Sequence, residues 1–245
     1  MSRRDVLVKI FKTVPKPIVW KFAKKYIAGE TLDDAIQTVR NLNAAGARAT
    51  MDVLGENLMT EKEVHDFAGS YKTTIDRIAS EGVDSGISIK PTAMGLKFNE
   101  QLALEVVDDV VAYATKKELF VRIDMEDTPV TQQTYDLYRE LRRRGYENIG
   151  VVMQAYLRRT MQDARDLAAE GANVRLCKGI YIEPRKLAYK DYQLVRDSFV
   201  DAMDALMRGA DTHTAVATHD DYLVFHGRRL VRELELDPKR YEFQM

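Results

Sequence analysis

The feature that most constrains the fold is the alternation of two hydrophobic patterns from residue 47 to the end of the chain. Short apolar runs of strand length are separated by longer segments in which apolar residues recur at helical spacing. This alternation is typical of βαβ units, whose parallel strands are joined by returning helices. It predicts seven strands, at Ala47–Leu54, Ser85–Lys90, Leu119–Asp124, Ile149–Ala155, Ala172–Lys178, Thr214–His219 and Arg240–Met245.

Local signals between these runs predict where helices begin and end. Thr31 and Thr60 are each followed three residues later by an acidic residue, Asp34 and Glu63, which is the pattern of a capping box. After Asn99, apolar residues recur at helical spacing and predict a helix packed on the sheet: Leu102, Val106, Val110 and Ala114. Helical patterns are followed by glycines suited to a left-handed closing residue, at Gly46, Gly82, Gly145, Gly171 and Gly209.

The predicted fold class is α/β, a (β/α)8 TIM-like barrel with an N-terminal helical segment. A doubly wound sheet is the alternative, but no glycine-rich phosphate loop follows any predicted strand. We expect a basic helical segment over residues 1–46 that packs on a barrel domain over residues 47–245. Seven strands are visible and the sequence stops on the seventh, so we expect a barrel truncated after that strand.

Composition and charge exclude several classes of protein. The chain is 45% hydrophobic and 31% charged, which excludes a disordered protein. With 37 basic and 38 acidic residues the net charge is −1, and we expect no nucleic-acid partner. The single cysteine, Cys177, favours a reducing, cytoplasmic location. The four histidines show no ligand spacing, so we expect no metal site.

Residues 1–28 form a distinct basic segment, with eight Lys or Arg and one Asp interleaved with apolar residues. Lysines and the pair Pro15 and Pro17 break every apolar run, so neither a secretory signal nor a transmembrane segment is predicted. Two interpretations remain open. The segment is a helical lid over one end of the domain, which the two prolines favour, or a basic amphipathic element at the surface of the inner membrane.

Polar side chains gather at the carboxyl ends of the predicted strands, where barrel enzymes place their working residues. A lone Lys or Asp at such an end is usually a solvated loop residue. Polar ends on strand after strand are harder to explain in that way, and they predict a site at this rim. The residues concerned are Asp52, Glu56, Lys90, Asp124, Glu126, Asp127, Gln154, Tyr156, Arg175, Lys178, Thr218, His219, Asp220 and Gln244.

Two of these strand ends leave alternatives open. Period-two alternation puts Arg175 and Lys178 on opposite faces of their strand. A mid-strand arginine is costly unless it is paired, so Arg175 either meets an inward carboxylate such as Asp124 or faces a bound anion. Asp220 is favoured as the N-cap of the next helix, whereas His219 fits a cofactor contact and a plain strand end equally well. No nucleophile elbow for a serine triad is present.

Seven separated blocks, in order and spacing, resemble the proline dehydrogenase family of flavin-dependent (β/α)8 barrels. The block from Arg175 to Pro184 is specific enough to carry the resemblance alone. The likeness extends over nearly the whole chain. The blocks are Asp52–Glu56, Ser88–Thr92, Arg122–Glu126, Gln154–Thr160, Arg175–Pro184, Ala217–Asp220 and Tyr241–Met245.

The resemblance implies oxidation of L-proline to pyrroline-5-carboxylate, with a hydride passed to FAD and the electrons then passed to quinone. It implies that Lys90 pairs with the substrate carboxylate. Asp124 and Arg175 take the positions of the family's catalytic acid and base pair. The residues implied to contact the flavin cofactor are Met125, Gln154, Lys178, Gly179, Ile180, Thr218 and His219.

The sequence departs from the family pattern after Met245. In the family an eighth strand and helix follow, and that helix supplies a tyrosine and an arginine pair that clamp the proline carboxylate. Loss of such a clamp costs about 2–5 kcal/mol of binding, so the resemblance implies weak or no activity for this chain. Two alternatives from other classes remain open. One is a Schiff-base aldolase or lyase barrel using Lys90 or Lys178, and the other is a non-catalytic barrel fragment whose open edge pairs with another chain.

Overall fold

The computed structural model describes residues 29, 31–55, 58 and 60–245. Internal contacts divide the described residues into two compact units, one that includes those up to residue 49 together with 77–85, and one that includes those within 50–76 together with 86–245. The basic segment 1–28, on which the lid and membrane hypotheses depend, lies outside the described residues, and so does Glu56. In the described part of the chain, no helix has both the length and the apolar character needed to cross a membrane.

Strands and helices alternate along the described chain as the sequence pattern predicts. Each predicted strand is present and overlaps its predicted range. The strands are β1 (Ala49–Asp52), β2 (Ser85–Ile89), β3 (Val121–Ile123), β4 (Ile149–Gln154), β5 (Asn173–Cys177), β6 (His213–Ala217) and β7 (Tyr241–Gln244). The α-helices are α3 (Leu32–Ala44), α4 (Glu61–Glu81), α5 (Glu100–Lys116), α6 (Thr131–Arg143), α7 (Thr160–Ala169), α8 (Tyr192–Arg208) and α9 (Asp221–Glu233), with 3-10 turns at η1 (Pro91–Met94), η2 (Thr128–Val130) and η3 (Pro238–Arg240).

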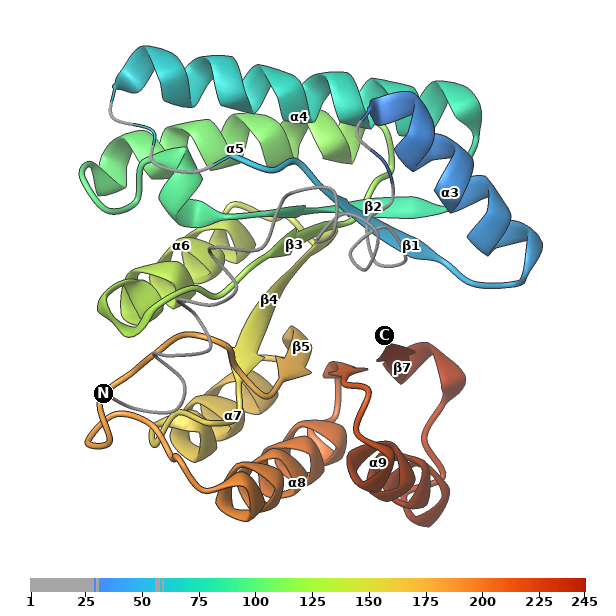
Figure 1. Ribbon diagram of the computed structural model, residues 1–245, viewed down its shortest axis with the longest axis vertical. Coiled ribbons are helices and arrows are strands. Elements are labelled where there is room, and N and C mark those ends of the chain that lie inside the picture. The colour runs from blue at the N-terminus through green and yellow to red at the C-terminus, as the bar shows by residue number, and fades with distance from the viewer. Residues whose placement is uncertain (1–28, 30, 56–57, 59) are drawn as a thin grey trace, which may run out of the picture. The chain divides into compact units, whose positions relative to one another are not determined.

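The described strands form one seven-stranded sheet in which strand order follows chain order from β1 to β7. The pairs from β2–β3 to β6–β7 are parallel. In a doubly wound sheet the order of the strands reverses at a switch point. The observed order has no reversal, so the doubly wound alternative is wrong. In Figure 1 helices α5 to α9 lie on the convex side of the curved sheet, which is the arrangement of a TIM-like barrel wall.

The core lies between the sheet and this helix layer. The predicted stripe on α5 is buried as expected, from Leu102 through Val106 and Val110 to Ala114. Strand β3 is buried along its whole length. Because apolar residues of the strands face these helices, the alternate residues face the concave side of the sheet, and polar side chains gather there.

The predicted helix boundaries are largely confirmed. Thr31 and Asp34 form a reciprocal capping box at the start of α3, and the Thr60 hydroxyl and the Glu63 carboxylate make the same exchange at α4. Four of the five predicted glycines have positive φ angles. Gly209 is the exception, because it is extended at φ −60° and ψ 133°. Its small size is needed instead for close packing, since a Cβ there would lie 2.4 Å from the Thr212 Oγ1 atom.

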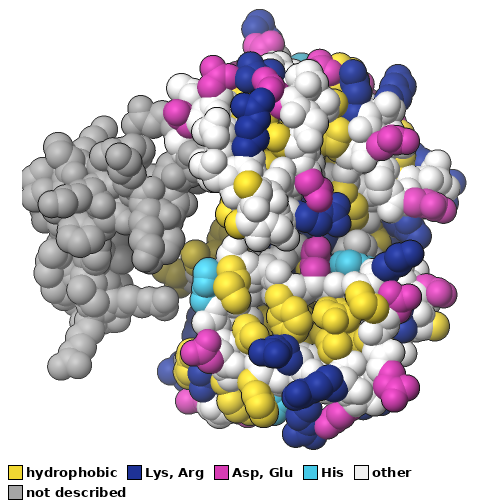
Figure 2. Space-filling view, turned by 90° about the vertical axis from the view of Figure 1, so that its right-hand side faces the viewer, with side chains coloured by type: hydrophobic (Ala, Val, Ile, Leu, Met, Phe, Trp, Pro, Cys, Tyr) yellow, Lys and Arg dark blue, Asp and Glu magenta, His cyan; other side chains and the backbone are white. Residues whose placement is uncertain are grey.

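Figure 2 shows acidic and basic side chains interspersed over the face it presents, with hydrophobic side chains grouped on its lower half. Many of the charged side chains form ion pairs along single helices, such as Arg208 with Asp204 and Arg229 with Glu233. Exposed ion pairs of this kind contribute little to stability individually.

Candidate active site

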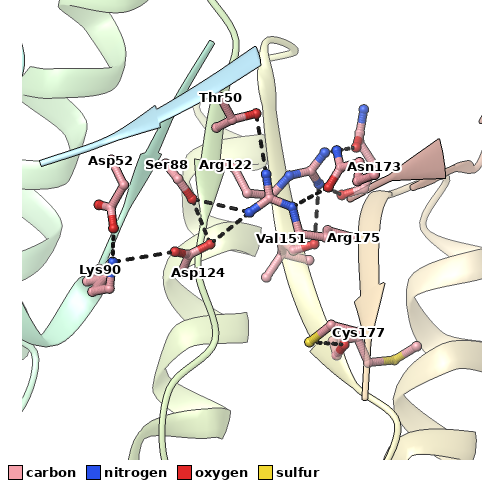
Figure 3. A network of polar contacts seen from close by, with 12 residues as sticks. Thr50, Asp52, Ser88, Lys90, Arg122, Asp124, Val151, Asn173, Arg175 and Cys177 are labelled. Carbon is pink, nitrogen blue, oxygen red and sulfur yellow. Dashed lines mark hydrogen bonds and ion pairs between the residues drawn. The ribbon is translucent and has the colours of Figure 1, made fainter. Parts of the chain in front are cut away.

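Three of the predicted site residues meet on the concave side of the sheet. Lys90 follows β2, Asp124 follows β3 and Arg175 lies in the middle of β5, and Figure 3 shows their side chains pointing toward one another. An Arg175 NH1 atom lies 3.2 Å from Asp124 Oδ1, and Lys90 Nζ lies 3.9 Å from Asp124 Oδ2. Of the two partners considered for Arg175, the inward carboxylate is therefore the one found.

The Asp124 carboxylate is held by neighbours on both sides. The Ser88 hydroxyl donates to Asp124 Oδ1 at 2.7 Å, and Ser88 in turn lies 3.4 Å from Arg175 NH1. Burial raises the pKa of Asp124 above its usual value, although Ser88, Arg175 and Lys90 oppose this shift. A carboxylate whose pKa is raised by desolvation accepts a proton more readily than a solvated one.

Lys90 has a second acidic partner. Its ammonium pairs with Asp52 at the end of β1, and Asp52 also accepts a hydrogen bond of 3.0 Å from the Tyr71 hydroxyl. Tyr71 is buried on α4, and desolvation together with Asp52 raises the pKa of its phenol well above the usual value. Tyr71 therefore stays protonated and serves as a donor that orients Asp52.

Arg175 spans the concave side of the sheet. Its Nε donates to Gln244 Oε1 on β7 at 2.7 Å, and its NH2 lies 3.4 Å from the Thr50 hydroxyl on β1. A side chain on β5 that contacts β1, β3 and β7 requires a sheet that curls around it. The curl is thus part of the site, because it brings side chains from distant strands to one guanidinium.

A second cluster surrounds Asp220, which precedes α9. Its side chain accepts from the Tyr222 backbone N–H, as predicted for an N-cap. It also pairs with Lys178 and, through two hydrogen bonds of 2.7 and 2.9 Å, with Arg196. These contacts, led by Arg196, hold the pKa of Asp220 well below its usual value. Lys178 therefore belongs to a different cluster from Arg175, as strand alternation predicts.

Comparison with known proteins identifies the family. A sequence model described as proline dehydrogenase matches residues 35–245. The chain is 36% identical over 223 residues to proline dehydrogenase 1 of Bacillus subtilis (strain 168), which covers 91% of this chain and 73% of that protein. It is 30% identical over 231 residues to proline dehydrogenase of Deinococcus radiodurans, covering 93% and 74% of the two chains. The chain belongs to the proline dehydrogenase family.

A solved structure agrees on the fold. Proline utilization A from Bdellovibrio bacteriovorus superposes with a TM-score of 0.84 at 23% identity, covering 93% of this chain and 28% of that chain. The likeness inferred from the seven sequence blocks is thus confirmed, with the α/β barrel class and the assignment to an oxidoreductase family. The residue roles that the resemblance implies are not tested by these comparisons and stay predictions.

The residues predicted to contact a cofactor lie in two places. Met125 and Gln154 are buried near the end of β3 and β4, where the Gln154 amide donates to the Glu126 carbonyl at 2.7 Å. The others surround the Asp220 cluster. Gly179 follows Lys178 at φ 101°, a conformation that favours glycine, and a Cβ there would lie 2.2 Å from the Tyr156 ring. Ile180 is 84% exposed, and Thr218 accepts from the Asp220 N–H at 3.1 Å beside the exposed His219.

Several residues that contact the cluster around Asp124, or lie next to it, are not predicted as site residues from the sequence. Arg122 is 1% exposed and donates to the Asn173 side chain and backbone. Burial and the nearby charge of Arg175 lower its pKa to about 9. Arg122 lies two residues before Asp124 on the same strand, so strand alternation predicts that both face the same side. By the same rule Ser88 shares a face with Lys90. Tyr71 has no such signal, because a tyrosine inside an amphipathic helix is ordinarily a core residue.

Proposed function

We propose that this chain oxidises L-proline to pyrroline-5-carboxylate, with FAD as the acceptor of the two electrons and quinone as the reagent that reoxidises it. Membership of the family supports the reaction class. The observation that carries the proposal for this chain is the cluster of Lys90, Asp124 and Arg175, since one carboxylate between two cations can bind and deprotonate an amino acid.

Lys90 would bind the substrate carboxylate. Its side chain is 28% exposed, so its ammonium can be reached from solvent, and an ammonium is a compact partner for a carboxylate. Asp52 and Asp124 balance that charge when no substrate is present.

Asp124 would act on the substrate nitrogen. Oxidation removes a hydride from the ring carbon next to the nitrogen and a proton from the nitrogen, and a C=N bond forms between the two atoms. Asp124 Oδ1 already accepts from Ser88 and Arg175. Oδ2, which faces Lys90 at 3.9 Å, is therefore the oxygen that takes the proton. The raised pKa of Asp124 suits this role.

The residues around β5 and β6 fit a flavin dinucleotide. When bound, the flavin supplies a two-electron acceptor. Gly179 allows close backbone approach, the exposed Ile180 offers an apolar surface, and the cations Lys178 and Arg196 suit phosphate groups. Arg175 would place a positive charge near the reducible end of the ring system, where negative charge accumulates. Met125, Gln154, Thr218 and His219 would complete the contacts.

The Schiff-base alternative receives less support. Such a mechanism needs a lysine with a neutral, unpaired amine. Lys90 pairs with Asp52, and Lys178 pairs with Asp220 while lying 4.7 Å from the centre of the Tyr192 ring. The alternative stays a prediction that borohydride trapping tests, and a non-catalytic fragment is tested by the experiment that follows.

The proposal is tested by loading the full chain with FAD and adding L-proline without oxygen. The yellow flavin absorbance should bleach, and an added soluble quinone should restore it. Lys90→Met should raise the proline concentration needed for half-maximal bleaching by about 30-fold or more, because a charge-assisted contact to the carboxylate is lost. Lys97→Met is the matched control, since Lys97 pairs with Asp127 outside the cluster.

A chain that binds FAD but is never bleached by proline would overturn the proposed reaction, and a folded chain that binds no FAD would favour the non-catalytic alternative. Restoration by oxygen alone, and never by quinone, would overturn the proposed acceptor. The rate of bleaching in the same assay tests the weak activity expected from the sequence pattern. That expectation is separate from the reaction proposed here. Contact with a membrane surface also stays a prediction.

A further inference from the structure

Arg175 is held from two opposite sides, and only one of them belongs to the reaction proposed above. On one side are Asp124 and Ser88. On the other, its Nε donates to Gln244 Oε1 at 2.7 Å. The residues of β6 that lie between β5 and β7 at this level are Ala215 and Ala217, in register with Arg175 and Gln244. Their short side chains leave the room that the long arginine side chain needs.

Gln244 can support Arg175 only in one of its two amide orientations. The oxygen accepts from arginine, whereas the NH2 group would place a donor against a donor. Glu242, two residues earlier and on the same face of β7, removes this ambiguity because Gln244 Nε2 donates to Glu242 Oε1 at 2.5 Å. A carboxylate accepts only, so Gln244 cannot turn over without losing both hydrogen bonds.

The environment keeps Glu242 in the charged form that this arrangement needs. His213 on β6 lies 3.9 Å from Glu242 Oε1, and its Nδ1 is 2.8 Å from the Lys239 carbonyl. The His213 contact, together with Gln244 and the charge of Arg122 on β3, holds the pKa of Glu242 at about 2 although burial acts in the opposite direction. Glu242 thereby places a negative charge near Arg122, as Asp124 does beside Arg175.

We propose that Glu242 is a positioning residue: it orients the Gln244 amide, and Gln244 in turn fixes the Arg175 guanidinium toward Asp124. The functional consequence rests on the proposed oxidation of proline, but the contacts themselves do not. Glu242 touches neither Asp124 nor Lys90 in the described contacts. Among the described hydrogen bonds, the one that Glu242 makes to Gln244 is the contact that connects it to Arg175.

The test measures hydrogen exchange of the Arg175 Nε–H by NMR in the full chain, with and without FAD, after assignment of the signal with Arg175→Lys. Glu242→Ala should speed this exchange about tenfold, which is the effect of losing one charge-assisted hydrogen bond. Glu242→Gln should restore slow exchange only in part, because its amide oxygen still accepts from Gln244 but its NH2 group no longer excludes the turned Gln244 amide. Glu233→Ala, which breaks a surface pair with Arg229 on α9, should change nothing and serves as the matched control.

A double mutant separates positioning from general loosening of β7. If Glu242 acts through Gln244, Glu242→Ala adds no further exchange to the Gln244→Ala chain. Equal effects in the two backgrounds, or no effect in either, would overturn the proposal. Turnover is the second readout, and kcat should fall in Glu242→Ala and recover in part in Glu242→Gln. If the chain does not oxidise proline but Arg175 Nε–H exchange follows the expected pattern, the proposed function is wrong and the positioning role of Glu242 is supported.

Discussion

At the scale of single residues, the site contrasts two aspartates whose pKa values move in opposite directions. Asp124 is desolvated and has its pKa raised, whereas Asp220 is held by Arg196 and Lys178 and has its pKa lowered. Asp124 follows β3 and Asp220 follows β6, and each pairs with an arginine. The difference arises because Asp220 receives direct hydrogen bonds from several donors, while burial dominates at Asp124.

We predict that Asp124→Asn raises the free energy of unfolding at pH 7 while abolishing turnover. The folded-state pKa of Asp124 is raised, so its ionised form costs stability above that pKa. The gain should shrink as pH falls and vanish below the unfolded value of 3.8, where wild-type Asp124 is protonated in both states. Urea unfolding at pH 7 and at lower pH measures the difference.

Asp220→Asn is the matched comparison for that experiment. Because the folded-state pKa of Asp220 is lowered, its ionised form stabilises the protein above the unfolded value. This variant should lose stability at pH 7, although asparagine can still cap α9. If both variants shift stability in the same direction, the assignment of burial as the dominant effect at Asp124 is wrong.

At the scale of elements, buried glutamates tie together the loops that follow the strands. Glu126 after β3 accepts from the N–H and hydroxyl of Thr92 in η1, at 2.8 and 2.6 Å. Glu183 after β5 accepts in the same way from Thr128 in η2, at 2.7 and 2.6 Å. Both carboxylates are less than 9% exposed. The loops carrying the site are therefore linked from β2 to β3 and from β3 to β5.

We predict that Thr128→Val lowers the free energy of unfolding by about 1–2 kcal/mol, because a buried carboxylate oxygen loses its donor while the shape of the side chain is kept. Hydrogen exchange in the segment after β5 should also become faster. Thr73→Val is the control, since the Thr73 hydroxyl donates only to the Gly69 carbonyl of its own helix in the described contacts. Equal losses in the two variants would show that the Thr128–Glu183 contact does not hold the loop.

At the scale of the whole molecule, the charged side chains interspersed in Figure 2 make the free energy of unfolding depend on pH. Glu140 and Glu242 have pKa values lowered to about 2, by Arg143 and by His213 respectively, and Asp76 is also lowered. Groups with lowered folded-state pKa values stabilise the protein above their unfolded values, and that contribution is lost as protonation proceeds. Asp124 and Asp163, whose pKa values burial raises, act in the opposite direction.

We therefore predict that the thermal midpoint falls as the pH is lowered from about 5 toward 2. Loss of the carboxylate charges also leaves 37 basic residues largely unbalanced, which adds repulsion. Calorimetry at a series of pH values measures the trend. A midpoint that is constant or rises over this range would mean that the desolvated aspartates, rather than the paired acids, dominate.

Local pattern was enough to predict much of the fold and part of the site. Strand positions, the capping boxes at Thr31 and Thr60 and the cap at Asp220 follow from short-range periodicity and hydrogen bonding, which neighbouring residues determine. Lys90 and Asp124 are expected together because parallel strands end at the same edge of a sheet, and Arg175 is expected to meet Asp124 because a mid-strand arginine is costly unless it is paired. Gly209 was predicted wrongly, because its requirement is set by Thr212 and Ala168 across a loop.

What the sequence determined by itself is therefore the order of elements and the face on which each polar side chain lies. Which side chains meet was decided only by the tertiary structure. The curl of the sheet brings Gln244 and Asp124 to opposite sides of Arg175 and buries Arg122 against Asn173, and the position of α4 places Tyr71 on Asp52. The physical reason is that periodicity reports the direction of a side chain relative to its own strand, whereas a contact depends on the packing of strands far apart in the chain.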